Sequence, residues 1–420
     1  MKIFTDLHIH SKYARGCSKD LVIENIVRNA KLKGLDLLGT GDFTHPLWLK
    51  ELEENLEEAG DGVYVWKKDD SVFFILTTEV STIFLRNGKI RRIHVLLGLP
   101  SFGKVKKLNS ILGKFGELQS DGRPTLKLDL KDLIDILFDI DEKALFIPAH
   151  IWTPWFSLYG SRSGFDSIKD AFGEKIKFVT AVETGLSSDP KMNWLLSELD
   201  GISIVSFSDA HSAYPHRLGR EATALEISEI NFDNILKAFK NPDEKNKILF
   251  TIEFFPEEGK YHYDGHRICG VRLSPQESKK FNHRCPVCLR EITIGVMHRV
   301  IDLADRNENY IDPQRPPFYH LVPLTEILAQ YYKKEPTNKK VLEIYQNMVL
   351  EFGNEFKILL GEIDQKIFEK KYSEINEALK KIRENKVELI PGFDGEYGKV
   401  ILFEKEEILE KARSQQKSLF

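Results

Sequence analysis

Short apolar runs alternate with amphipathic stretches over residues 1–250 of the chain. Residues 1–10 alternate with the period of a strand, residues 21–30 have the spacing of a helix that stops at Gly34, and residues 35–40 form the next apolar strand. Further strands are predicted at residues 72–79, 90–97, 144–150, 178–183 and 202–207. Strands separated by helices in this way are typical of an α/β protein with a largely parallel sheet.

The pattern becomes mainly helical beyond residue 292. Helices are predicted there at residues 301–306, 323–333, 339–360 and 363–385, and earlier in the chain at 46–59 and over most of 104–137. We therefore predict three domains, at residues 1–250, 255–300 and 301–420, the last being helical with a short C-terminal tail. The glycines of residues 388–400 indicate close approach of the backbone to another strand or to a phosphate, and a structural turn is the favoured interpretation.

The predicted strands share one feature, which is an acidic or imidazole side chain at the C-terminal end. His8 and His10 are two residues apart in a strand, so both side chains point to the same face. Residues of the same kind recur near the ends of later strands, namely Asp42, His45, Glu79, His94, His150, Glu183, Asp209 and His211. One histidine at a strand end is more often a hydrogen-bonded residue than a ligand, but this recurrence favours a common site. Convergence from many strands indicates a closed or nearly closed β/α barrel.

These side chains predict a metal centre. The expected ligands are His8, His10, Asp42, His45, Glu79, His94, His150, Asp209 and His211. They are too many for one zinc ion, which usually takes four ligands. They suit two or three divalent ions (Zn²⁺, Mg²⁺ or Mn²⁺) that share a carboxylate about 4 Å apart, as in sites that cleave phosphoesters. The chain has no glycine-rich loop of the Walker type, so phosphoryl transfer from a nucleotide is not favoured.

A separate, structural metal site is predicted within residues 255–300. Cys285 and Cys288 form a Cys-x2-Cys knuckle, which is the usual half of a structural zinc site. We expect one structural Zn²⁺ bound by His266, Cys269, Cys285 and Cys288, with His262 or His283 as substitute ligands. The alternative is that the three thiols are incidental.

Composition and charge narrow the classes of protein to which this chain can belong. The chain has 420 residues and a net charge of −4, so overall charge does not point to nucleic acid, although a local basic groove remains compatible. Met1 leads almost directly into a strand without a signal peptide, and no apolar run is long enough to span a bilayer. Four cysteines in a chain of this length do not resemble a disulfide scaffold. We expect a cytoplasmic protein with no membrane partner.

The motifs Asp6–Ser11, Glu79, His94, His150 and Ser208–His211 resemble those of the PHP (polymerase and histidinol phosphatase) family over residues 1–250. The resemblance implies a distorted (β/α)7 barrel and a trinuclear metal centre that hydrolyses phosphoesters. The implied ligands are His8, His10, Glu79 and Asp209 for one metal, Glu79, His94 and His150 for a second, and His211 with a partner from residues 42–45 for a third. The chain has Asp-Phe at 42–43, where the family commonly has Asp-His, and residues 12–16 offer no further ligand. Either His45 substitutes or the third site is weak.

The PHP-like barrel, the cysteine knuckle and the tail Pro391–Gly398 together resemble the archaeal endonuclease Q family over nearly the whole chain. The runs that sharpen the resemblance are residues 149–155, 183–187 and 261–269. The resemblance implies a metal-dependent DNA endonuclease that nicks 5′ of deaminated bases (uracil, hypoxanthine, xanthine) and of abasic sites. The expected catalytic residues are Glu79, Glu183, Asp209 and His211. Two alternatives stay open, a small-molecule phosphoesterase of the histidinol-phosphatase kind and a non-catalytic DNA-binding module.

An enzyme that reads one damaged base in double- or single-stranded DNA must take that base out of the stack. Trp152 and Trp155 closely follow His150, and we expect them to stack on the base; packing under the barrel rim is the alternative. The expected phosphate contacts are Arg91, Arg92, Arg217 and Arg220. Residues Gln415–Phe420 resemble a tail that binds a sliding clamp, and we expect the protein to associate with the nucleoid.

Overall fold

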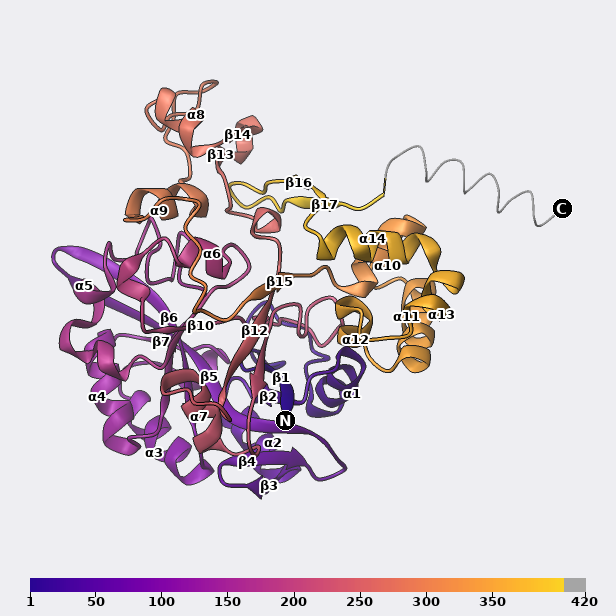
Figure 1. Ribbon diagram of the computed structural model, residues 1–420. Coiled ribbons are helices and arrows are strands. Elements are labelled where there is room, and N and C mark those ends of the chain that lie inside the picture. Colours follow the sequence, from indigo (N-terminus) through magenta and orange to yellow (C-terminus); the bar gives the residue numbers. More distant parts are fainter. Residues whose placement is uncertain (404–420) are drawn as a thin grey trace.

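The computed structural model describes residues 1–403, in which eleven strands form one mixed sheet (Figure 1). The main path runs in the order β15 (Phe318–His320), β12 (Lys247–Glu253), β11 (Ala222–Glu226), β1 (Lys2–Asp6), β2 (Leu37–Gly39), β5 (Asp69–Arg86), β4 (Val63–Trp66) and β3 (Leu56–Gly60). Off this path, β6 (Lys89–Leu99) and β7 (Thr125–Leu126) pair with β5, and β8 (Leu145–Pro148) pairs with β6. β1, β2 and β5 run parallel, whereas β6 is antiparallel to β5 and β8. This mixture of helices and strands confirms the predicted α/β class.

A separate parallel pair, β9 (Ala181–Glu183) and β10 (Ser203–Val205), lies between β8 and β11. Hydrogen bonds outside the strand ladders hold it there. On one side the Thr180 N–H donates to the Phe146 carbonyl at 2.9 Å. On the other side the Ser206 N–H donates to Oγ1 of Thr223, in β11, at 3.0 Å. The pair is therefore connected to both flanks of the large sheet.

The helices of this part follow the amphipathic pattern of the sequence. α1 (Ile23–Lys33) buries Ile26, Val27 and Ala30 and ends at Gly34, whose φ of 94° is left-handed. The others are α2 (Pro46–Asn55), α3 (Phe102–Leu112), α4 (Leu130–Ile140), α5 (Ile168–Phe172), α6 (Pro190–Asn193) and α7 (Phe232–Lys240). In Figure 1, α3 and α4 lie side by side on the outer flank of the sheet.

In two segments the helices are shorter than the sequence pattern predicted. The helix expected over 46–59 ends at Asn55, and the chain continues directly into β3. Residues 104–137, expected to be mostly helical, contain the end of α3 and most of α4, because glycines and a proline between residues 113 and 124 interrupt the pattern. Within residues 1–403, no helix combines the length and the apolar character needed to cross a membrane.

A small unit projects from the sheet at the top of Figure 1. It contains β13 (Asp264–His266), β14 (Val271–Leu273), α8 (Pro275–Lys280) and α9 (Val296–Leu303). The C-terminal part contains α10 (Leu324–Tyr332), α11 (Lys339–Phe352), α12 (Glu355–Leu360), α13 (Gln365–Lys371), α14 (Ser373–Arg383) and the hairpin of β16 (Glu388–Ile390) and β17 (Lys399–Ile401). The single helix expected over 339–360 is split at Gly353, where a φ of 105° ends α11 and Asn354 caps α12.

A buried ion pair joins α1 to α12. Lys33 Nζ lies 2.8 Å from Glu355 Oε1, and both side chains are at most 1% exposed. Glu355 also accepts hydrogen bonds from the Leu324 N–H at 2.9 Å and from the Tyr345 hydroxyl at 2.8 Å. This carboxylate therefore links the N-terminal part of the chain to three C-terminal helices.

Replacing Glu355 by alanine is expected to lower the free energy of unfolding by about 3–5 kcal/mol, because the Lys33 ammonium then stays buried without a partner. Urea unfolding followed by circular dichroism measures this loss. The control is Glu362→Ala, which removes the exposed partner of Lys2 and is expected to cost less than about 1 kcal/mol. Equal effects of the two substitutions would contradict the importance of the buried pair.

Candidate metal centre

Three residues of the predicted site have an unusual backbone conformation. Asp42, His150 and Asp209 have φ values of 48°, 31° and 46°, in the left-handed region that residues other than glycine rarely adopt. Each follows closely after a strand, namely β2, β8 and β10. All three side chains contact His10 or Glu79. Backbone strain of this kind collects at functional sites, and here it directs three strand ends to one place.

Two groups of side chains could each hold a metal ion, and Glu79 belongs to both. The first consists of His8, His10, Glu79 and Asp209, and the second of Glu79, His94 and His150. In the first group, Glu79 Oε2 lies 3.3 Å from His10 Nε2 and 3.5 Å from His8 Nε2. In the second, Glu79 Oε1 lies 2.7 Å from His94 Nδ1 and 3.2 Å from His150 Nε2. Glu79 thus presents one oxygen to each group, as a bridging carboxylate does.

The donor atoms fit divalent metal ions. His8 Nε2 is fully buried and has no hydrogen-bond partner, although such an atom normally finds one. It points toward Glu79 Oε2 at 3.5 Å and Asp209 Oδ1 at 3.7 Å, so a cation between the three would satisfy it. Imidazole nitrogens and carboxylate oxygens are the ligands that zinc and manganese accept.

The charges of the cluster also favour cations. Burial alone would raise the pKa of Glu79, but His94 and the guanidinium of Arg123 hold it well below the usual range. Burial likewise opposes ionisation of Asp209, yet hydrogen bonds from His10 and His211 hold its pKa well below the usual range. Both carboxylates are therefore anionic, and the cluster attracts positive charge, whether as protons or as metal ions.

Two further carboxylates orient the imidazoles. Glu183 lies 2.9 Å from His8 Nδ1 and accepts the backbone N–H of His150 at 2.7 Å. Asp42 Oδ1 lies 2.9 Å from His10 Nδ1, and Asp42 Oδ2 accepts two hydrogen bonds from Ser11. A carboxylate on Nδ1 leaves Nε2 free for a metal. The structure therefore places Glu183, which we predicted to be catalytic, and Asp42, which we predicted to be a ligand, behind the two histidines.

Replacing Glu183 by glutamine is expected to weaken metal binding about 10–100-fold, which is typical when a partner of a metal-binding histidine is lost. Metal titration of the apoprotein by calorimetry measures the change. Glu198→Gln is the matched control, because Glu198 binds the Tyr159 hydroxyl at 2.7 Å, away from the ligands. Unchanged affinity in Glu183→Gln would contradict the orienting role.

The third predicted metal has weaker structural support within residues 1–403. His45 stacks on Tyr13 with ring centroids 4.4 Å apart, its Nε2 lies 3.2 Å from the Gln119 carbonyl, and it joins neither ligand group. His211 Nε2 lies 3.3 Å from Asp209 Oδ1, and its side chain is 40% exposed. His211 therefore stands at the open side of the centre, and His45 does not face it there as a second ligand.

A cavity of about 460 Å³ opens beside the candidate metal ligands. His150, Asp209 and His211 are among its lining residues. Its aromatic lining comes from Trp155, Tyr261 and Tyr397, and its positive charge from Arg217, Arg220 and Lys260. The cavity thus places aromatic rings and positive charges next to the candidate metal centre, a lining that suits a nucleotide.

Trp152 does not reach this cavity. It is 1% exposed, its indole N–H donates to Asn193 Oδ1 at 2.8 Å, and its ring stacks on Tyr159 at a centroid distance of 4.8 Å. The structure therefore favours packing under the rim for Trp152, and its stacking on DNA stays a prediction.

The four predicted phosphate contacts fall into two pairs. Arg217 and Arg220 line the cavity, and Arg220 Nε donates to the Ser208 carbonyl at 3.1 Å. Arg91 and Arg92 lie over the rings of Phe165 and Phe156, at 4.3 and 5.9 Å from the ring centroids. Contact of all four with phosphates stays a prediction.

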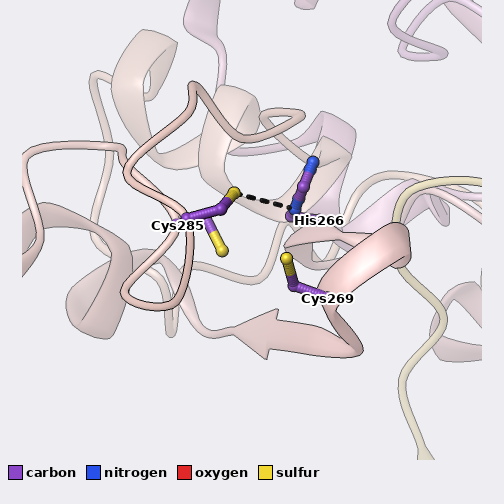
Figure 2. A group of neighbouring side chains, drawn as sticks. His266, Cys269 and Cys285 are labelled. Atoms are coloured by element: carbon purple, nitrogen blue, oxygen red, sulfur yellow. Dashed lines mark hydrogen bonds between the residues drawn. The ribbon is translucent and has the colours of Figure 1, made fainter.

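The predicted zinc ligands come together in the projecting unit. His266, Cys269, Cys285 and Cys288 each offer an atom within 4.8 Å of the others. Figure 2 shows the side chains of His266, Cys269 and Cys285 pointing toward one another, and Cys288 Sγ lies 3.6 Å from His266 Nδ1. Neither His262 nor His283 joins this group.

A further group, Asp264, His283 and His298, lies in the same unit. Asp264 Oδ2 and His298 Nδ1 are 2.5 Å apart and share a hydrogen bond. Asp264 also accepts the backbone N–H of Gly295 at 2.7 Å. These contacts hold α9 against β13. The group is therefore explained by its role in packing the two elements together.

Sequence reasoning missed Arg123, Lys260, Tyr261 and Tyr397 as site residues. Tyr261 opens the run 261–269, and Tyr397 lies in the glycine-containing segment that we interpreted as a structural turn. That segment forms the turn between β16 and β17, and it also brings Tyr397 to the cavity. The glycines were the available signal, because they indicated close approach of the backbone. Arg123 had no such signal.

Comparisons with known proteins extend over the whole chain. It is 34% identical to the lesion-specific endonuclease PfuEndoQ from Pyrococcus furiosus, covering 98% of this chain and 97% of that one with a TM-score of 0.85. It is also 34% identical to endonuclease Q in a complex with a 27-mer duplex that has an abasic lesion at the active site, covering 98% of both chains with a TM-score of 0.86.

Two further matches concern parts of the chain. The MJ0043 C-terminal domain family matches residues 323–386. The protein MJ0043 of Methanocaldococcus jannaschii is 38% identical over 256 residues, which are 59% of this chain, and the match spans only 31% of that relative. The solved structures, by contrast, match from end to end at 34% identity. On that ground the chain belongs to the endonuclease Q family.

Proposed function

We propose that this chain is a metal-dependent DNA repair endonuclease that nicks the phosphodiester 5′ of a damaged nucleotide. The substrates would be deaminated bases (uracil, hypoxanthine, xanthine) and abasic sites in DNA. The observation that carries the proposal is the end-to-end similarity to a lesion-specific endonuclease, a relative whose solved complex has an abasic lesion at the active site. The two ligand groups that share Glu79 support hydrolysis as the chemistry.

The proposed roles follow from the geometry. His8, His10, Glu79 and Asp209 would hold one ion, and Glu79, His94 and His150 a second. Ions at these places would lower the pKa of a bound water and offset the negative charge on the phosphate oxygens. Glu183 and Asp42 keep the imidazoles in the binding orientation. His211, whose side chain is 40% exposed, would give a proton to the sugar oxygen that leaves.

The cavity beside the metals would receive the damaged nucleotide. Trp155 and Tyr261 lie edge to face with centroids 5.4 Å apart, and both line the cavity. Stacking on such rings is worth about 1–3 kcal/mol per base and tolerates different bases. Arg217, Arg220 and Lys260 would bind the flanking phosphates. This arrangement suits an enzyme that accepts several lesions.

We also infer that residues 1–250 form the distorted (β/α)7 barrel that the PHP resemblance implies. The hydrogen bonds on both flanks of the β9–β10 pair, together with the pairing of β11 with β1, support closure. Residues 255–300 and 301–420 would then be two DNA-binding additions. The predicted clamp-binding tail, Gln415–Phe420, lies outside the described residues, and a nucleoid location stays a prediction.

The test is a nicking assay on end-labelled duplexes that each contain one uracil, hypoxanthine or abasic site, with Mg²⁺, Mn²⁺ or Zn²⁺ added. We expect one nick on the 5′ side of the lesion and none in an undamaged duplex or in the presence of EDTA. Failure to nick with every metal, together with turnover of a phosphomonoester, would instead support a small-molecule phosphoesterase. Lesion binding without any hydrolysis would support a non-catalytic module.

A further inference from the structure

Arg123 is held rigidly beside the metal ligands by the segment before β7. The Pro124 carbonyl accepts the N–H of Ser81, two residues after Glu79, at 3.0 Å. Gly122 packs so closely on Asp42 that a Cβ there would lie 2.4 Å from Oδ2. Asp121 Oδ1 accepts the backbone N–H of Arg123 at 3.2 Å. The backbone position of Arg123 is therefore fixed by contacts with the site itself.

The guanidinium group faces the bridging carboxylate with one nitrogen only. Arg123 Nη1 donates to Glu79 Oε2 at 3.0 Å, at the oxygen that also faces His8 and His10. Within residues 1–403, the Arg123 side chain makes no other hydrogen bond, although a guanidinium has five N–H donors. The side chain is 23% exposed while Glu79 is fully buried. The other guanidinium N–H donors of Arg123 therefore have no hydrogen-bond partner among residues 1–403.

We propose that Arg123 is a catalytic residue that holds Glu79 with one edge of its guanidinium and donates to a non-bridging oxygen of the scissile phosphate with the other. Arginine keeps its charge, and its planar fork can bind a carboxylate and a phosphate at the same time. Arg217 and Arg220 line the nucleotide cavity, whereas Arg123 contacts the metal-bridging residue itself. Of these three arginines, Arg123 is therefore the one that contacts a proposed metal ligand.

The inference rests on the proposed function. In the hydrolysis, a water oxygen bonds to phosphorus, the bond from phosphorus to one sugar oxygen breaks, and a proton goes to that sugar oxygen. Arg123 makes and breaks no covalent bond. It stabilises the extra negative charge on the non-bridging oxygens while phosphorus has five oxygen neighbours.

The experiment compares the wild type with Arg123→Ala and Arg123→Lys in single-turnover nicking of an abasic duplex. We expect Arg123→Ala to be about 10²–10³-fold slower, as for the loss of one preorganised donor, and Arg123→Lys to be intermediate. Added guanidinium ion is expected to restore part of the Arg123→Ala rate. Arg15→Ala is the matched control, since Arg15 lies 3.6 Å from Asp121 in the same region, is 76% exposed, and is expected to leave the rate within twofold.

Two readouts other than activity separate phosphate contact from mere support of Glu79. Metal content is expected to be unchanged in Arg123→Ala. The slope of lesion-DNA affinity against salt is expected to fall by about one, as for one lost phosphate contact. Loss of metal with full recovery of the rate on metal addition would overturn the inference in favour of a supporting role. A normal rate in Arg123→Ala would overturn it outright, whereas an inactive wild type would overturn the proposed function and this inference with it.

Discussion

Replacing Glu79 by glutamine is expected to lower the single-turnover nicking rate by at least ~10⁴-fold and to remove one or both metal ions. Glu79 is shared by both ligand groups and gives one oxygen to each. Glutamine has the same shape but one carbonyl oxygen and no charge, so it cannot bridge two cations. A 10⁴-fold loss corresponds to about 5–6 kcal/mol of transition-state stabilisation, which is the scale of metal-ion catalysis.

Metal analysis of desalted protein, run beside the nicking assay, measures both parts of this expectation. Glu54→Gln is the control, because Glu54 is 59% exposed and pairs only loosely with Lys50, at 3.8 Å. The control is expected to keep the metal content and the rate of the wild type. If Glu79→Gln kept both metals and nicked within tenfold of the wild type, Glu79 would not be the bridge.

The sequence contained enough to predict the α/β class and the residues that converge. The two-residue spacing of His8 and His10 places both side chains on one face, and Glu79 and Asp209 stand near the ends of other strands. These four residues form one group in the structure. Period and position along a strand are local properties, so they can be read without knowing how the strands pack.

Other features depend on tertiary packing and have no local signature. Arg123 reaches Glu79 across 44 residues, because the segment before β7 lies against β5. Trp152 and Trp155 are three residues apart, yet one is buried against Tyr159 and the other lines the cavity. His45 is near Asp42 in sequence, but it stands directly before α2 and its ring stacks on Tyr13. In each case the neighbouring elements determine where the side chain points.

Replacing Cys285 by serine is expected to remove one zinc ion per chain and to unfold the unit of residues 264–292. This unit has a small core, in which Leu273, Cys285 and Ile292 are the buried residues. A core of that size cannot offset the entropy of folding, whereas a structural zinc contributes about 10–16 kcal/mol in small domains. Cys17→Ser is the control, since it removes a thiol outside the zinc group.

The loss of zinc is also expected to loosen one wall of the cavity beside the candidate metal centre, because Asp394 connects the two. Asp394 accepts the Arg267 N–H at 2.7 Å and the Thr293 hydroxyl at 2.6 Å, so the projecting unit helps to hold the turn that contains Tyr397. Backbone hydrogen bonds to residues 257–263 also hold this turn. Hydrogen exchange in Cys285→Ser is therefore expected to rise over residues 264–292 and 391–398 and to stay unchanged in β8. The affinity for lesion DNA is expected to fall as well, because Tyr397 lines the cavity. Zinc loss with unchanged exchange over 391–398 would mean that residues 257–263 and the hairpin itself hold the turn, and that the projecting unit acts on DNA independently of the cavity.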